Sequence, residues 1–185
     1  MHFMTVAPAI RIAALALLPW TGLLGGCATP AETEAMIPET ASAEKTHPYS
    51  ITVEVTGGRA TETTGTPQIA NDAFDEAITE TLIKTKAFAR VKQDKAGNYA
   101  LEVIIFNVQQ PPPIGSGSAS VTMETGWTLT NLLTGEIVWQ KALRSTYTAA
   151  SNSDLTFIGR LKKAMEGVAK DNIKQGVTEI ARLSL

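Results

Sequence analysis

The side chains that most often carry out chemistry are scarce in this sequence. Its 185 residues include one cysteine, Cys27, and two histidines, His2 and His47. His2 lies at the start of the chain and His47 lies in a polar stretch, so the folded part is predicted to contain neither residue type. The usual general base, nucleophile and metal ligand are therefore expected to be absent. We predict that the protein is not an enzyme and holds no metal or cofactor.

Cys27 follows an apolar run that has the character of an export signal. From Ile12 to Leu24 the residues are almost wholly apolar, and residues 1–26 contain no Asp or Glu. The run is shorter than the about 20 residues that cross a membrane. It has the length of the apolar region of a secretory signal. We therefore predict that residues 1–26 are a signal peptide.

The four residues at the end of this run, Leu24, Gly25, Gly26 and Cys27, resemble a bacterial lipobox. The resemblance implies that a signal peptidase recognises the first three and cuts before Cys27. It also implies a diacylglycerol on the Cys27 sulfur and usually a further acyl chain on its amine. Two or three such chains hold a protein firmly, at about 0.8 kcal/mol per buried CH₂. The alternatives are an ordinary signal peptide with a chance cysteine and an uncleaved anchor.

Position 28 carries an alanine where an aspartate would retain enteric lipoproteins in the inner membrane. The resemblance therefore implies an address at the periplasmic face of the outer membrane. Residues 27–48 are predicted to be the lipidated cysteine and a disordered tether, because Pro30, Pro38 and Pro48 interrupt a run without an apolar face. Such a tether would reach at most about 70 Å.

Residues 49–185 are predicted to form a single periplasmic domain. Period-two and helical patterns predict strands from Tyr49, Phe88, Tyr99, Val121 and Ile137, and helices over Pro67–Lys86 and Asp154–Leu183. Gly159, Gly167 and Gly176 of the second helix either permit close contact with the sheet or mark weak points of the helix. The order β-α-β-β-β-β-α predicts an α+β fold of two layers. Its mostly antiparallel sheet of about five strands would carry two amphipathic helices on one face.

Several segments, including "HPYSITVEV", "FDEAITETLIKTKAFARV" and "WTLTNLLTGEIVW", resemble a family of small uncharacterised proteobacterial lipoproteins. Some relatives are labelled UDP-N-acetylglucosamine acyltransferase. Enzymes of that name resemble a left-handed β-helix of hexapeptide repeats with a catalytic histidine. This chain has no hexapeptide period, and its lipobox implies a place outside the cytoplasm, so we expect no such activity. The architecture also resembles transport-auxiliary lipoproteins.

The expected partners are the membrane, through the lipid anchor, and another protein of the envelope. Sixteen basic and 18 acidic residues form no basic stripe, which argues against nucleic acid. A candidate partner-binding loop contains Pro111, Pro112, Pro113 and Ile114, because polyproline is already extended and binds at low entropic cost. The alternative is a stiff connector between strands.

The sequence favours a non-enzymatic binding or accessory module of the cell envelope. One alternative is a carrier of a lipid or other apolar ligand between sheet and helices. Another is an envelope hydrolase or transferase that uses carboxylates alone, for which Glu54, Glu102 and Glu124 are the candidates. Trp127 and Trp139, on neighbouring predicted strands, could be a core pair or an interface anchor.

Overall fold

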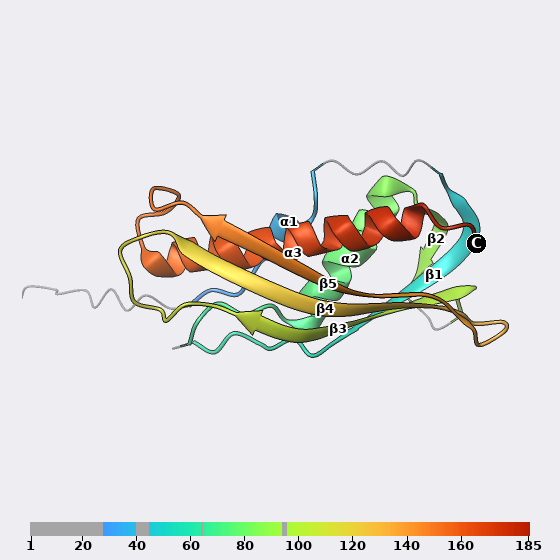
Figure 1. Ribbon diagram of the computed structural model, residues 1–185, viewed down its shortest axis with the longest axis horizontal. Helices are drawn as coiled ribbons and strands as arrows, with labels where there is room; N and C mark the ends of the chain where they lie inside the picture. Colours follow the sequence, from blue (N-terminus) through green and yellow to red (C-terminus); the bar gives the residue numbers. More distant parts are fainter. Residues whose placement is uncertain (1–27, 40–44, 64, 94–95) are drawn as a thin grey trace, which may run out of the picture.

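The fold is a five-stranded sheet with helices packed against one of its faces (Figure 1). The computed structural model of the protein describes residues 28–39, 45–63, 65–93 and 96–185. In chain order, the elements are α1 (Thr33–Met36), β1 (His47–Thr56), α2 (Asn71–Thr85), β2 (Phe88–Lys92), β3 (Tyr99–Gln109), β4 (Ala119–Asn131), β5 (Ile137–Ala149) and α3 (Phe157–Ala181).

The strands lie in the order β2-β1-β3-β4-β5. β1 is parallel to both β2 and β3, whereas β3, β4 and β5 form an antiparallel meander. The predicted α+β class is confirmed, and α2 and α3 are the two expected helices. The sheet is mixed rather than mostly antiparallel, because α2 carries the chain back to the start of β1 and so makes β2 parallel to it. The short helix α1 was not expected.

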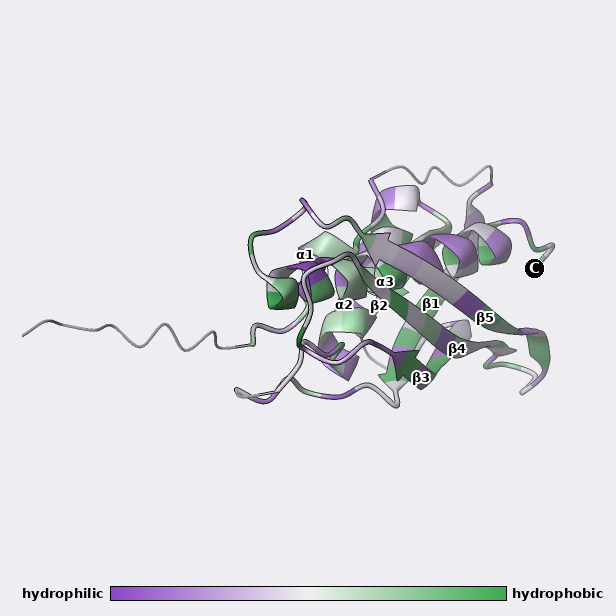
Figure 2. Ribbon diagram, turned by 60° about the vertical axis from the view of Figure 1, so that its left-hand side comes forward, coloured by the Kyte–Doolittle hydropathy of each residue, from purple (hydrophilic) through white to green (hydrophobic). Residues whose placement is uncertain are grey.

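β4 shows most clearly how the sequence divides the sheet into two faces. Figure 2 shows hydrophobic and hydrophilic residues following each other along the strands. The buried positions of β4 alternate with more exposed ones, as the period of a strand requires. The buried ones are Ala119, Val121, Met123, Thr125, Trp127 and Leu129. α3 packs on this inner face over β4 and β5.

Two glycines of α3 let the helix lie close to aromatic rings of the sheet, which is the first of the two roles considered for them. A Cβ on Gly176 would stand 2.6 Å from the Trp127 ring, and one on Gly167 would meet the Tyr147 ring. The Trp127 indole N–H donates to Thr125 Oγ1 at 2.9 Å and to Asn172 Oδ1 at 3.1 Å. Trp127 is therefore a core residue, and its polar atom is satisfied inside the core.

α2 begins later than the sequence predicts. The spacing predicts a start at Pro67, but residues 67–70 are not helical and the helix starts at Asn71. The backbone N–H of Arg59 donates to the Ile69 carbonyl at 2.9 Å, and the N–H of Gly58 donates to Asn71 Oδ1 at 2.7 Å. These bonds to the preceding loop replace the first helical turn.

The structure contradicts the predicted disordered tether over residues 28–39. Residues 28–39 pack on the domain, and Ala31, Met36 and Ile37 belong to its hydrophobic core. α1 contacts both α2 and α3. Polar contacts hold the same segment, because Lys162 lies 2.6 Å from Glu32 Oε1 and Thr33 donates to Glu76 at 3.1 Å. The ordered domain thus begins well before Tyr49.

His47 also belongs to the fold, contrary to the expectation that the domain lacks histidine. It is the first residue of β1 and is fully buried. Its Nε2 atom lies 3.1 Å from the Ile180 carbonyl of α3, and its ring centroid lies 4.9 Å from that of Phe88. Nε2 therefore carries the proton in this contact, and the residue joins β1 to the last turns of α3.

Replacing Gly176 by leucine should destabilise the fold by about 1–3 kcal/mol, because the new side chain would enter the space of the Trp127 ring. Urea denaturation of the purified protein measures this loss. The matched variant is Gly117→Leu, since a Cβ there meets nothing within 4 Å. Its free energy of unfolding should change by no more than about 0.5 kcal/mol. Equal losses in the two variants would contradict the packing described here.

Candidate functional site

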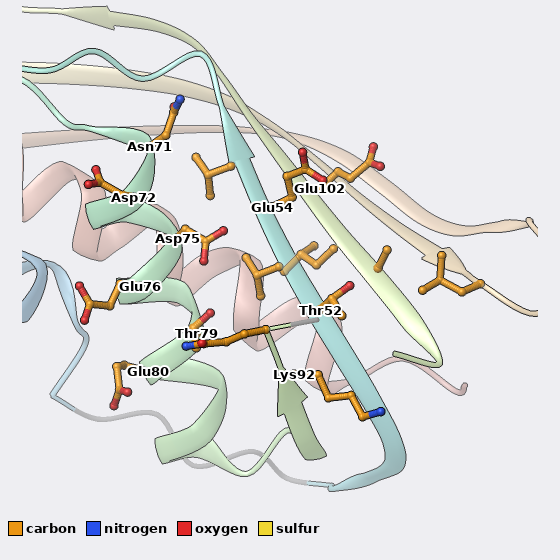
Figure 3. Close-up of a pocket in the computed structure, with 16 residues that line it drawn as sticks. Thr52, Glu54, Asn71, Asp72, Asp75, Glu76, Thr79, Glu80, Lys92 and Glu102 are labelled. Carbon is orange, nitrogen blue, oxygen red and sulfur yellow. The ribbon is translucent and has the colours of Figure 1, made fainter. Parts of the chain in front are cut away.

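A groove of about 790 Å³ runs between α2 and the edge of the sheet (Figure 3). Its walls come from α2, β1, the end of β2, the start of β3 and the β4–β5 hairpin. Six carboxylates line it, together with one basic residue, Lys92, among the described lining residues. The carboxylates are Glu54, Asp72, Asp75, Glu76, Glu80 and Glu102.

The groove exists because β2 is much shorter than β1. The pairing between these strands ends at Thr52 and Lys92, whereas β1 continues to Thr56. On its other side, β1 stays paired with β3 as far as Thr56 and Ile104. Residues 53–56 therefore form a sheet edge that faces α2 rather than another strand. Exposed strand edges are sites of unwanted pairing unless a protein covers them.

Asp75 covers this edge from the middle of α2. Its carboxylate accepts hydrogen bonds from the Thr79 side chain and the Val55 backbone N–H. Burial raises the pKa of Asp75 above its usual value of 3.8, and the charge of Glu54 raises it further, while these two hydrogen bonds oppose the rise. Asp75 thus connects the helix to the strand and satisfies a backbone donor there.

The other acidic residues of α2 do not converge on Asp75. Figure 3 shows Asp72, Glu76 and Glu80 on the side of the helix away from β1, while Asp75 and Thr79 point toward the strand. Glu76 accepts the hydrogen bond from Thr33 that holds α1. Within the described ranges, no group of three or more His, Cys, Asp or Glu side chains is placed to hold a metal ion.

Glu54 and Glu102 form the other wall of the groove. They are partners in the register of β1 and β3, and Figure 3 shows their side chains near each other. Lys92 directs its ammonium group to the Ala96 carbonyl at 3.0 Å. Of the three carboxylates considered for acid–base work, the structure brings Glu54 and Glu102 together, whereas Glu124 pairs with Arg144 at 3.0 Å. The excess of carboxylates suits a cationic partner.

Asp75 is not among the candidate residues predicted from the sequence. It is half-buried, whereas Asp72 at the start of α2 is exposed. Its place in the helical pattern could have indicated this burial. Asp75 follows Phe74 and is three residues before Ile78, so it borders the buried face of α2. The sequence could not indicate that a free strand edge lies opposite.

The residues singled out by the sequence lie elsewhere. Leu24, Gly25, Gly26 and Cys27 fall outside the described residues, so their proposed processing stays a prediction. Pro111 is half-buried, and Pro112, Pro113 and Ile114 are exposed in the loop between β3 and β4. This loop is not part of the groove. In the described residues, no helix is both long and apolar enough to cross a membrane.

No protein-family model matches the chain, and no curated protein matches it by sequence. Solved structures are similar in fold. Protein XCC0632 from Xanthomonas campestris, described with the family model DUF330, is 14% identical over 77% of this chain and 88% of that chain, with a TM-score of 0.56. Hypothetical protein CT253 from Chlamydia trachomatis is 9% identical over 71% and 95%, with a TM-score of 0.51.

A minor lipoprotein from Acinetobacter baumannii is 12% identical over 71% of this chain and 91% of that chain, with a TM-score of 0.43. At these identities the likeness concerns the fold alone. The same α+β fold differs from the left-handed β-helix that the acyltransferase label implies. The chain therefore shares its fold with XCC0632 and CT253, whose TM-scores exceed 0.5.

The raised pKa of Asp75 has a measurable consequence for stability. Between pH 3.8 and the higher folded pKa, the folded state binds more protons than the unfolded chain, so the free energy of unfolding falls as the pH rises. Asp75→Asn removes this titration and still accepts hydrogen bonds. We expect the variant to lose less stability than the wild type between pH 3.8 and neutral pH.

Denaturation curves at a series of pH values test this, with Glu80→Gln removing one negative charge from the same helix as a control for net charge. An equal pH slope in the wild type and in Asp75→Asn would contradict the assignment.

Proposed function

We propose that this protein is a lipid-anchored accessory protein of the bacterial envelope, which binds another envelope component and catalyses no reaction. The observation that carries the proposal is the run Leu24-Gly25-Gly26-Cys27, which ends in the one cysteine of the chain and directly precedes the ordered domain at Ala28. Alanine at position 28 favours the periplasmic face of the outer membrane. A cysteine without a partner for a disulfide is suited to attachment.

The acidic groove is the part of the domain that we assign to partner binding. Six carboxylates and one basic residue line it. Glu54, Glu102 and Asp75 lie between α2 and the sheet, and Asp72, Glu76 and Glu80 extend the negative charge to the far side of α2. Charge attraction of this kind speeds encounter and selects partners more than it adds affinity. The proposed partner therefore presents a positively charged surface or segment.

A carboxylate-based hydrolase is the second candidate, since the raised pKa of Asp75 beside Glu54 is the pattern of an acid–base pair. The bonds of Asp75 to Thr79 and to the backbone of Val55 favour a structural role instead. An enzyme would lose its turnover of envelope glycans in the Glu54→Gln variant. The lipid-carrier alternative gains no support from the close packing of α3 on Trp127.

Cys27→Ser tests the anchor. The variant should leave the membrane fraction or accumulate as the unprocessed precursor, because no acyl chain can then be attached. Cell fractionation and the mobility of the protein on a gel measure this, and circular dichroism should show an unchanged domain. Ala28→Asp is the companion variant, expected to move the protein toward the inner membrane. A Cys27→Ser protein at normal size and in its normal membrane would refute lipidation.

Photo-crosslinking in living cells tests the groove. A photoreactive residue at Glu102 should give one discrete adduct, whereas the same residue at Lys174, exposed on α3, should not. Neutralising Asp72 and Glu54 together should weaken the Glu102 adduct several-fold if charge recruits the partner. Identical adducts from both positions would show that the groove does not select a partner.

A further inference from the structure

The predicted anchor is attached directly to the folded domain. Ala28 follows Cys27, and its backbone N–H donates to the Thr63 carbonyl at 3.3 Å. Ala31 donates in turn to the Gln68 carbonyl at 3.2 Å. Consecutive Cα atoms lie 3.8 Å apart, so a lipid on residue 27 would be held beside the domain rather than at the end of a long tether. The part of the surface near Ala28 must then face the bilayer.

Two loops lie at the same end of the molecule as Ala28. Figure 1 shows the β3–β4 loop and the β5–α3 loop at the end where the described chain begins, and the β4–β5 hairpin at the opposite end. Gln110, at the base of the β3–β4 loop, donates to Thr66 Oγ1 at 2.9 Å. Thr66 belongs to the segment that holds Ala28 and Ala31, so the anchor segment and this loop are neighbours.

Each of the two loops holds a large apolar side chain in solvent. Ile114 of the β3–β4 loop is 88% exposed, and Leu155 of the β5–α3 loop is fully exposed. The β3–β4 loop lies against the start of α3, because a Cβ on Gly115 would lie 2.8 Å from the ring of Phe157, the first residue of that helix. Residues 109–120 carry no charged side chain, and Asp154 is the one charged residue of the β5–α3 loop, residues 150–156. The Asp154 carboxylate lies 3.7 Å from the Lys163 ammonium group, so these two loops present few charges that a bilayer would desolvate.

Leu155 is exposed although its loop is well braced. Asp154 Oδ1 accepts the backbone N–H of Thr156 at 3.0 Å, and Thr156 Oγ1 caps α3 by accepting the N–H of Gly159 at 2.9 Å. Arg160 donates to the Asp154 carbonyl at 2.7 Å. These bonds on both sides fix the backbone of Leu155, so its side chain is presented outward by the fold.

We propose that this loop end is a membrane-contact surface, in which Ile114 and Leu155 insert into the lipid interface beside the anchor. The proposal rests on the proposed lipidation of Cys27. The acyl chains hold the domain at the bilayer, which gives the domain a high local concentration at the membrane surface. Two apolar side chains are then enough to keep it in contact. The domain then lies on the membrane in one orientation, with the β4–β5 hairpin directed away from it.

The test uses the mature lipoprotein in vesicles of phosphatidylethanolamine and phosphatidylglycerol. Acylation would occupy the Cys27 sulfur, so Ile114→Cys and Leu155→Cys each supply a single thiol for an environment-sensitive fluorophore. Leu133→Cys is the matched control, because Leu133 is an equally apolar residue, 92% exposed, in the β4–β5 hairpin. We expect blue-shifted, several-fold brighter emission at 114 and 155, quenched by nitroxide-labelled lipids, and no change at 133.

The outcomes separate the two proposals. A labelled protein that does not float with the vesicles contradicts the lipid anchor itself. A protein that floats but has labels at 114 and 155 as accessible to water as the label at 133 overturns the membrane-contact surface and leaves the anchor intact. Labels that respond only when other envelope proteins are added would assign the loops to a protein partner and also overturn it.

Discussion

The close approach of α3 to β4 is the contact on which the rest of the structure depends. Gly176 leaves space for the Trp127 ring, and Asn172 accepts from the side chains of both Trp127 and Thr125. Asn172 also donates to Ser145 of β5 at 3.2 Å, so this buried network ties the helix to two strands. A buried polar group left without its partner costs about 1–3 kcal/mol. The network therefore fixes one position of α3 along the sheet.

In this position, α3 holds a different segment of the chain at each of its two ends. Its first half carries Lys162, whose ammonium group lies 2.6 Å from Glu32 and 3.3 Å from Glu166. Burial alone would lower the pKa of Lys162, but the hydrogen bonds and charges of these two glutamates raise it. The last turns of α3 contact His47 through the Ile180 carbonyl. The helix thus holds the anchor-proximal segment at one end and the start of β1 at the other.

Elements whose pattern is local could be predicted, and those that depend on distant residues could not. Alternation identified β4, and helical spacing identified α3. Residues 28–39 carry no periodic apolar face, and Met36 is buried only because α2 and α3 supply its surroundings. His47 stands among polar neighbours, so nothing nearby in the sequence indicates its burial. The groove likewise arises from the difference in length between β1 and β2.

The two surfaces proposed to bind partners are compatible in space. The acidic groove extends to Leu132 in the β4–β5 hairpin, at the end of the molecule opposite to the loops that carry Ile114 and Leu155. Contact of the loops with the bilayer would therefore leave that end of the groove open to the periplasm. The Val55 N–H already donates to Asp75 and is not available to pair with a strand of another protein. A partner would therefore contact the carboxylates of Glu54 and Glu102. Such recognition would weaken with salt, because charges are screened over about 8–10 Å.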